Sequence, residues 1–168
     1  ADELSEVGAG LQLSPNAGRV LLDLGLDEAI AGAAMEPAAI EVRSGRTGRV
    51  LAAIPVPAFR ERYGFPYRVI HRADLQAVLL AAVRRTSGIR LILGATLGDV
   101  LERPHERLVK VSGGHGEVLP AAAIIGADGV WSKLRETIPG SAGAQSAGRT
   151  AWRTVMPLDN LPPDVPAD

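Results

Sequence analysis

The 168-residue chain contains no cysteine, and this absence excludes several kinds of chemistry. Without thiols it can form no disulfide, carry no thiolate nucleophile and hold no Cys-ligated zinc or iron–sulfur centre. A chain without disulfides is compatible with a reducing compartment, so we expect a cytoplasmic protein. The three histidines are not at metal-ligand spacing, and we expect no metal site.

Long apolar runs and an excess of one charge are missing as well. No stretch approaches the ~20 apolar residues that a membrane-spanning helix needs, and the acidic first residues do not resemble a signal peptide. Eighteen Lys and Arg face nineteen Asp and Glu, so nothing points to nucleic acid or an anionic membrane. Ser132 does not stand in a G-x-S-x-G elbow, and we name no catalytic side chain.

What is present indicates a folded domain of alternating helices and strands. Apolar residues make up 46% of the chain and charged residues 22%, which is ordinary for a globular protein. Periodicity and helix-capping residues predict helices at 15–24, 26–34, 73–85 and 131–138. Alternation and turn residues predict a hairpin of strands 39–43 and 49–54 and a meander of strands 97–103, 108–111 and 117–119. An extended stretch is predicted at 68–70 and a further strand at 151–156. Two apolar runs, 89–93 and 121–125, are predicted to be buried strands, the second of them in a parallel sheet.

Residues 126–135 carry the most informative motif. They join the strand predicted at 121–125 to the helix predicted at 131–138, and ligands bind at such strand ends in open α/β sheets. Gly126 and Gly129 allow a positive φ and a close approach of the backbone to a ligand. The segment is therefore a candidate for cofactor binding.

The polar residues of this segment allow two interpretations. Asp128 only accepts hydrogen bonds, so it suits ribose hydroxyls or water and not a phosphate directly. Ser132 and Arg135 can satisfy the loop through hydrogen bonds. The alternative is an ordinary strand–turn–helix in which Asp128 caps the helix.

Residues 8–13 half-resemble a dinucleotide-binding fingerprint. The full fingerprint needs a preceding strand, a third Gly or Ala where Leu13 stands, and an acidic residue ~20 positions later. The alternatives are a flexible bend leading into the next helix, or a backbone that passes close to a flat ligand where Gly10 removes the steric barrier.

Two other segments carry weaker signals. Arg72 stands at the start of the helix predicted at 73–85, where it can offer its donors to phosphate or ribose. The alternative is a surface arginine paired with an acid. Residues 55–67 are predicted to form an irregular loop, and residues 59–67 hold four of the six aromatic side chains. They either line a pocket for an apolar ring or cover the core, and we favour the cover.

Taken together, four blocks resemble the group A flavoprotein monooxygenases, of the salicylate hydroxylase and p-hydroxybenzoate hydroxylase kind. The blocks are residues 7–17, 71–75, 126–135 and 151–153, and their order and separations cover nearly the whole chain. The third block, Asp128-Gly129-Val130-Trp131-Ser132-Lys133-Leu134-Arg135, matches the D-G-x-x-S-x-x-R motif that is specific to these enzymes.

The resemblance implies an α/β fold in which two regions are interleaved. Residues 1–37 and 68–138 would form part of a Rossmann-like FAD-binding domain, and residues 38–67 and 139–168 part of a β-rich substrate-binding region. It also implies that NADH or NADPH reduces FAD, that O₂ then forms a flavin hydroperoxide, and that an aromatic or similar ring is hydroxylated. The flavin supplies this chemistry, and the protein positions it.

The resemblance further implies contacts with FAD. Gly10 and Leu11 would pass near the flavin, and Arg72 would contact the ribose or phosphate region. Leu97 would hold the adenine through its backbone. Asp128 would lie near the pyrophosphate.

The chain departs from the family at both ends. The family's G-x-G-x-x-G unit would precede Ala1 and its G-D motif would follow Asp168, so the chain corresponds to a central portion. We expect it to bind FAD only weakly by itself and, through exposed sheet edges and apolar surface, to form homo-oligomers. Two alternatives stay open: a non-catalytic interaction module that keeps the scaffold, and a reductase or halogenase of the same fold.

Overall fold

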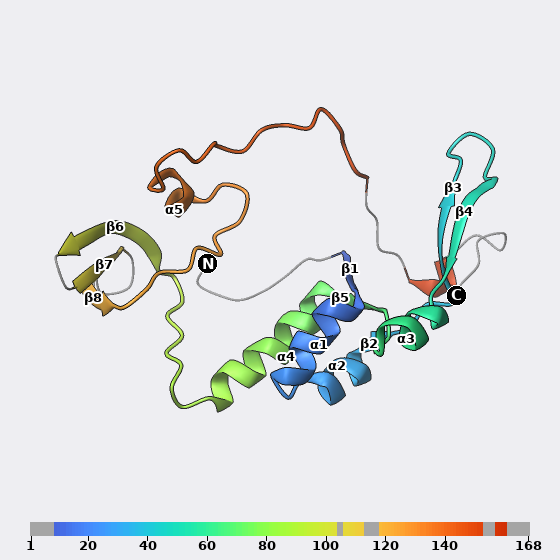
Figure 1. Cartoon of the computed structure of the whole chain (residues 1–168), viewed down its shortest axis with the longest axis horizontal. Coiled ribbons are helices and arrows are strands. Elements are labelled where there is room, and N and C mark those ends of the chain that lie inside the picture. The colour runs from blue at the N-terminus through green and yellow to red at the C-terminus, as the bar shows by residue number, and fades with distance from the viewer. Residues whose placement is uncertain (1–8, 104–105, 113–117, 153–156, 161–168) are drawn as a thin grey trace. The chain divides into compact units, whose positions relative to one another are not determined.

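The computed structural model describes residues 9–103, 106–112, 118–152 and 157–160. The chain divides into two compact units, one built on Ser5–Arg90 and the other on Leu91–Trp152. Figure 1 shows the elements of both units. Over the ranges described, the helices are all too short or too polar to cross a bilayer.

The first unit is centred on a small antiparallel sheet. Its middle strand, β5 (Arg68–His71), pairs with β1 (Gly10–Leu13) on one side and β2 (Ala34–Met35) on the other. The helices of this unit are α1 (Pro15–Asp23), α2 (Asp27–Ala33), α3 (Pro57–Tyr63) and α4 (Arg72–Arg85). The predicted helices at 15–24, 26–34 and 73–85 and the extended stretch at 68–70 are thereby confirmed.

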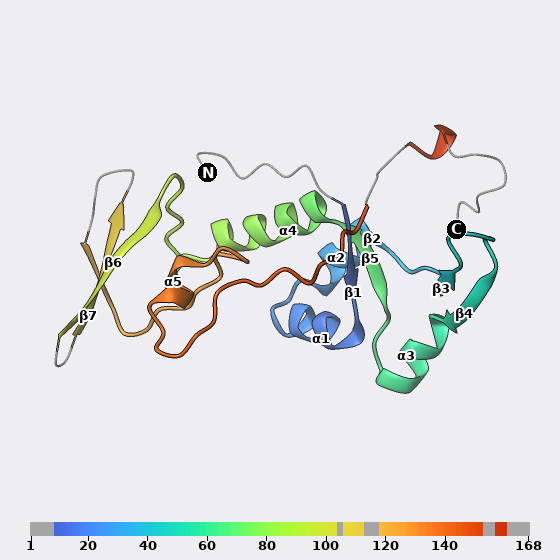
Figure 2. The same cartoon turned by 90° about the horizontal axis from the view of Figure 1, so that it is seen from above.

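The core of the first unit lies between this sheet and the helices. Leu13, Leu26, Ile30 and Ile70 are buried together, and the apolar side of α4 packs against them. Both α1 and α4 contact α2, and α1 and α2 lie beside the sheet in both views (Figure 1, Figure 2). This core therefore holds β1, β5 and the start of α4 in one place.

The ends of α1 follow from its sequence. Pro15 occupies the first turn, where its missing N–H costs nothing. Gly25 has φ of 70°, and the N–H groups of Gly25 and Leu26 donate back to carbonyls in the last turn of α1. Ser14 precedes the helix and is a residue type that favours the N-cap, but its hydroxyl donates to the Asn16 side chain and accepts no hydrogen bond from a helix N–H.

The prediction of an irregular loop at 55–67 is wrong for the residues that form α3. Pro57 stands in the first turn of this helix, and Gly64 ends it with φ of 70° while donating to the Arg60 carbonyl at 2.9 Å. Proline and glycine interrupt a helix in its interior, but at these two positions they begin and end one.

The predicted hairpin is confirmed. Strand β3 (Ala39–Arg43) pairs with β4 (Val50–Pro55), and a register irregularity lies between Val42 and Arg43. Most side chains of both strands are exposed. A two-stranded hairpin with so little burial is marginal by itself.

The second unit contains a three-stranded antiparallel sheet. Strands β6 (Thr96–Arg103), β7 (Glu106–Ser112) and β8 (Val118–Ala121) pair in that order, which confirms the predicted meander. Its turns fall at 104–105 and 113–117, outside the described residues. The helix predicted at 131–138 is shorter, α5 (Lys133–Glu136), and a single 3₁₀ turn, η1 (Leu158–Asn160), is described near the end of the chain.

The two predicted buried strands at 89–93 and 121–125 are wrong. Residues 89–93 form no strand and are exposed. Of the run 121–125, only Ala121 belongs to a strand, the antiparallel β8, and Ile125 is 91% exposed. A continuous apolar run becomes a parallel strand only when strands pair with it and helices cover both faces. No described strand pairs with residues 89–93 or 122–125. The strand predicted at 151–156 falls mostly on residues outside the description.

Candidate functional site

In the first unit, strand pairing brings two of the predicted segments together. Gly10 on β1 lies opposite His71 on β5, and the N–H of Arg72 donates to the Ala9 carbonyl at 3.4 Å. Gly10 is therefore part of a strand, so the interpretation of residues 8–13 as a flexible bend is wrong for its described part. The first helical residue of α4 stands directly beside this strand.

The space beside Gly10 is open. A Cβ built on Gly10 would meet no atom within 4 Å, and the residue is exposed. Leu11 lies opposite Ile70 and is half-buried, as is Arg72 at the N-terminal end of α4. The open backbone of β1 thus lies next to the N-terminal end of α4, where helix N–H groups favour anions and where the chain places Arg72.

A buried arginine that sequence reasoning missed anchors β5. The side chain of Arg68 is 9% exposed, and its Nη1 lies 2.6 Å from Asp27 Oδ1 and its Nε 3.5 Å from Glu36 Oε1. Its guanidinium also lies 5.5 Å from the centroid of the Phe65 ring. The sequence does hold a signal for this role, since Arg68 directly precedes the apolar residues Val69 and Ile70. A charged side chain in such a strand is buried, and a buried charge requires partners.

In the second unit, Asp128 organises the loop before α5. Ser132 Oγ donates to its Oδ1 at 2.6 Å, and the N–H groups of Lys133 and Leu134 donate to its Oδ2 at 2.9 and 3.3 Å. The hydrogen bond from Ser132, together with those from the two backbone groups, holds the pKa of Asp128 below its ordinary value. The capping geometry that was the alternative for this residue is thus present.

The other residues of the motif brace the same loop, as expected. The N–H of Arg135 donates to Ser132 Oγ at 3.0 Å, and its guanidinium donates to the carbonyls of Val130 and Gly129 at 3.2 and 3.3 Å. Gly129 has φ of 80°, which favours glycine. At Gly126, a Cβ would come within 2.8 Å of the side chain of Leu134.

A small hollow of about 260 Å³ opens beside this loop, lined in part by Gly126, Asp128 and Arg135. A carboxylate has about four acceptor positions, and the loop already uses three of those of Asp128. The carboxylate is exposed, so one position is left for a hydroxyl or water. A cofactor contact of Asp128 stays a prediction.

The five predicted FAD-contacting residues therefore fall into two groups. The structure brings Gly10, Leu11 and Arg72 together in the first unit. Leu97 lies in the second unit on β6, opposite Val111 of β7, and Asp128 lies in the loop before α5. Their roles toward a cofactor stay predictions.

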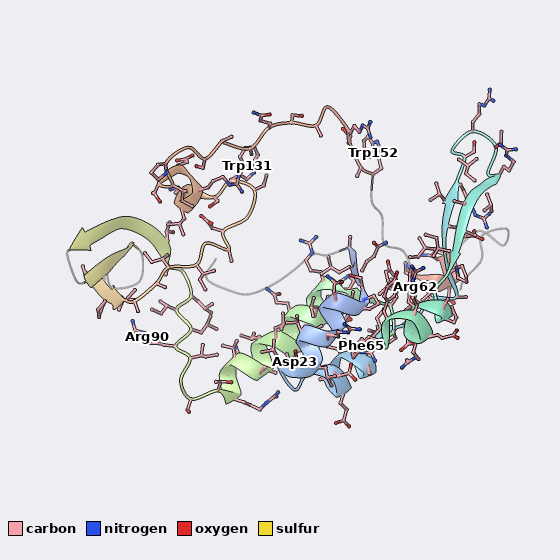
Figure 3. All side chains as sticks on the ribbon, viewed as in Figure 1. Asp23, Arg62, Phe65, Arg90, Trp131 and Trp152 are labelled. Atoms are coloured by element: carbon pink, nitrogen blue, oxygen red, sulfur yellow. The ribbon has the colours of Figure 1, made fainter. Side chains whose placement is uncertain are left out.

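The order of the Asp128 loop is expected to be lost only in strong acid. Its folded pKa is lowered, so its contribution to stability is complete above the ordinary value of about 3.9 and is lost as the pH falls through the folded value. Trp131 is 83% exposed next to this loop (Figure 3). With Trp152→Phe removing the second fluorophore, Trp131 emission should stay constant down to about pH 5 and change below about pH 4.

The matched variant is Asp128→Asn, which cannot titrate and should abolish the acid step in Trp131 emission. A step that persists in this variant, or one that occurs near neutral pH in the parent, would contradict the role assigned to the carboxylate.

The chain has relatives among known proteins. No family model matches it. The 3-hydroxybenzoate 6-hydroxylase 1 of Aquipseudomonas alcaligenes is 33% identical over 166 residues, which cover 98% of this chain and 42% of that protein. The 3-amino-4-hydroxybenzoate 2-monooxygenase of Streptomyces cremeus is 37% identical over 163 residues, 96% of this chain and 40% of that protein. The chain is similar in sequence to ring-hydroxylating monooxygenases and to the FAD-dependent monooxygenase OpS4 of Beauveria bassiana, with 32% identity over 168 residues.

The solved structures agree on the fold of these monooxygenases. HpxO of Klebsiella pneumoniae, solved with FAD and uric acid, matches with a TM-score of 0.65 at 21% identity, covering 82% of this chain and 34% of that chain. The resemblance to group A flavoprotein monooxygenases and the α/β flavoprotein fold class are confirmed. The chain spans about 40% of the length of the two curated relatives.

Proposed function

We propose that this chain supplies part of the FAD-binding region of a monooxygenase that hydroxylates an aromatic or similar ring, with NADH or NADPH as the reductant. The observation that carries the proposal is the pairing of β1 with β5, which sets Gly10 beside Arg72. Bound FAD would supply the activation of O₂, and the protein would supply position and electrostatics.

The residues of the first unit fit such a cofactor. The open space over Gly10 suits a planar ring system lying on the strand backbone, with Leu11 alongside it. The N-terminus of the 14-residue helix α4 and the guanidinium of Arg72 suit the negatively charged phosphates. Leu97 and Asp128 would add contacts to the adenine and to the pyrophosphate region.

The names of the two relatives support a substrate class. The two curated proteins are named for 3-hydroxybenzoate and 3-amino-4-hydroxybenzoate. Both compounds are aromatic rings that bear a carboxylate and a hydroxyl. We therefore place a small aromatic acid, with O₂, as the substrate of the complete enzyme.

A chimeric enzyme tests the proposal. The 168 residues would replace the matching stretch of the Aquipseudomonas hydroxylase, and flavin content and reductant-dependent hydroxylation of 3-hydroxybenzoate would be measured. We expect the chimera to retain FAD and hydroxylate the ring. Arg72→Met should weaken FAD binding about tenfold or more, because a hydrogen bond to a charged phosphate is lost.

Arg46→Met is the matched control, because Arg46 lies in the exposed turn between β3 and β4, and it should leave FAD affinity unchanged. A folded chimera that holds no flavin would contradict the proposal and favour the non-catalytic interaction module. Equal FAD affinity in both variants would remove Arg72 from the site.

A further inference from the structure

Tyr67 carries a buried hydroxyl that has no role in the proposed FAD contacts. The residue is 6% exposed, and within the described part of the chain its hydroxyl has no hydrogen-bond partner. Buried tyrosine hydroxyls usually find a partner, because an unsatisfied buried donor lowers stability. The Tyr67 hydroxyl, on the residue directly before β5, therefore lacks a hydrogen-bond acceptor that would stabilise it.

The surroundings of Tyr67 are aromatic. The ring centroid of Phe59 on α3 lies 5.7 Å from that of Tyr67 and 5.7 Å from that of Tyr63, with the rings tilted. We call these three residues the aromatic cluster. At its outer end the guanidinium of Arg62 lies 5.4 Å from the centroid of the Tyr63 ring.

The neighbouring charge does not satisfy the hydroxyl. Arg68 follows Tyr67 in the chain, but its guanidinium is engaged by Asp27 and Glu36. Burial raises the pKa of Tyr67 above its ordinary value, so the hydroxyl keeps its proton at neutral pH. It can therefore act as a hydrogen-bond donor throughout the physiological range.

We infer that the Tyr67 hydroxyl donates a hydrogen bond to an aromatic carboxylic acid whose ring packs on the aromatic cluster. The inference rests on the proposed function, and it assigns part of the substrate contact to this chain. Rings of this kind pack well against another ring, and an acceptor oxygen satisfies the buried donor. This is the pocket interpretation that the sequence left open for residues 59–67.

A ligand can reach the hydroxyl only if a neighbouring group moves. The hydroxyl oxygen is closed off from solvent, and Phe59 of α3 lies against its ring. Helix α3 has no buried residue, and its Arg60 makes an exposed ion pair with Glu36 at 2.9 Å. Besides this ion pair, α3 is held by a hydrogen bond from the Arg19 side chain to the Tyr63 carbonyl. We assign the movement that admits a ligand to this helix.

Tyr67→Phe tests the inference on the 168-residue chain. It removes the hydroxyl and keeps the ring. With 3-hydroxybenzoate as the probe, titration followed by NMR should show saturable binding to the parent, and the variant should raise Kd about tenfold or more. The thermal midpoint of the variant should be equal or higher, because an unsatisfied buried donor is gone.

Thr47→Val is the control, since it removes an exposed hydroxyl from the turn between β3 and β4, outside the aromatic cluster, and it should leave Kd unchanged. Absence of saturable binding to the parent, an unchanged Kd in Tyr67→Phe, or a lower thermal midpoint of that variant would each overturn the inference. The titration needs neither flavin nor turnover. The two proposals can fail separately. If the chimera hydroxylates 3-hydroxybenzoate but Tyr67→Phe binds it as well as the parent does, only this inference is wrong. If the parent chain binds 3-hydroxybenzoate but the chimera is inactive and holds no flavin, the proposed function is wrong.

Discussion

Replacing Gly18 with alanine is expected to destabilise the first unit by about 2–3 kcal/mol, measured by urea unfolding. A Cβ built on Gly18 would lie 2.2 Å from the ring of Phe65, a distance that no pair of non-bonded carbons tolerates. Gly18 is buried in α1, and Phe65 is itself 8% exposed. The ring or the helix must therefore move, and both belong to a packed core.

The sign of this effect makes it diagnostic. In an unhindered helix the same exchange stabilises by about 0.5–1 kcal/mol, because glycine loses more backbone entropy on folding. Gly32→Ala in α2 is the matched control, since a Cβ there meets nothing within 4 Å. Phe65→Leu combined with Gly18→Ala should recover part of the loss. Equal stabilisation by both glycine exchanges would show that Phe65 does not lie on α1.

Replacing Arg68 with methionine is expected to cost about 2–3 kcal/mol of unfolding free energy, also measured by urea unfolding. Removing one partner of a fully buried pair costs about 3–5 kcal/mol, and the cost here is smaller because the side chain of Asp27 is 31% exposed. Glu36 keeps its pairing with Arg60. The unpaired charge that remains is therefore mainly that of Asp27.

Arg60→Met is the control for this prediction. The side chain of Arg60 is 60% exposed, and exposed pairs contribute less than about 1 kcal/mol. Asp27→Asn in the Arg68→Met background should recover part of the loss, since it removes the unpaired charge. If Arg68→Met proved no more costly than Arg60→Met, the network would not anchor β5.

Local signals in the sequence predicted the elements that local forces form. Pro15 and Gly25 delimit α1, and the turn residues between 43 and 50 specify the β3–β4 hairpin. The bracing of the Asp128 loop by Ser132 and Arg135 also spans only a few residues. Such features depend on spacing alone and can be read directly.

The errors and omissions involve partners distant in sequence. The apolar run at 121–125 needs neighbouring strands to become a buried strand, and its own residues cannot supply them. The contact of Gly18 with Phe65 and the pairing of Gly10 with His71 join segments far apart in the chain. Only the fold shows that such residues are neighbours. The same holds for the unsatisfied hydroxyl of Tyr67, since no pattern within residues 59–67 indicates what lies around it.

The central claim is that the first unit presents Gly10, Leu11 and Arg72 to FAD, and an NMR titration of the isotopically labelled chain with FAD tests it most directly. We expect weak binding, with amide shifts concentrated at these three residues, and loss of those shifts in Arg72→Met but not in Arg46→Met. Shifts confined to other parts of the chain, or an identical response from both arginine variants, would contradict the claim.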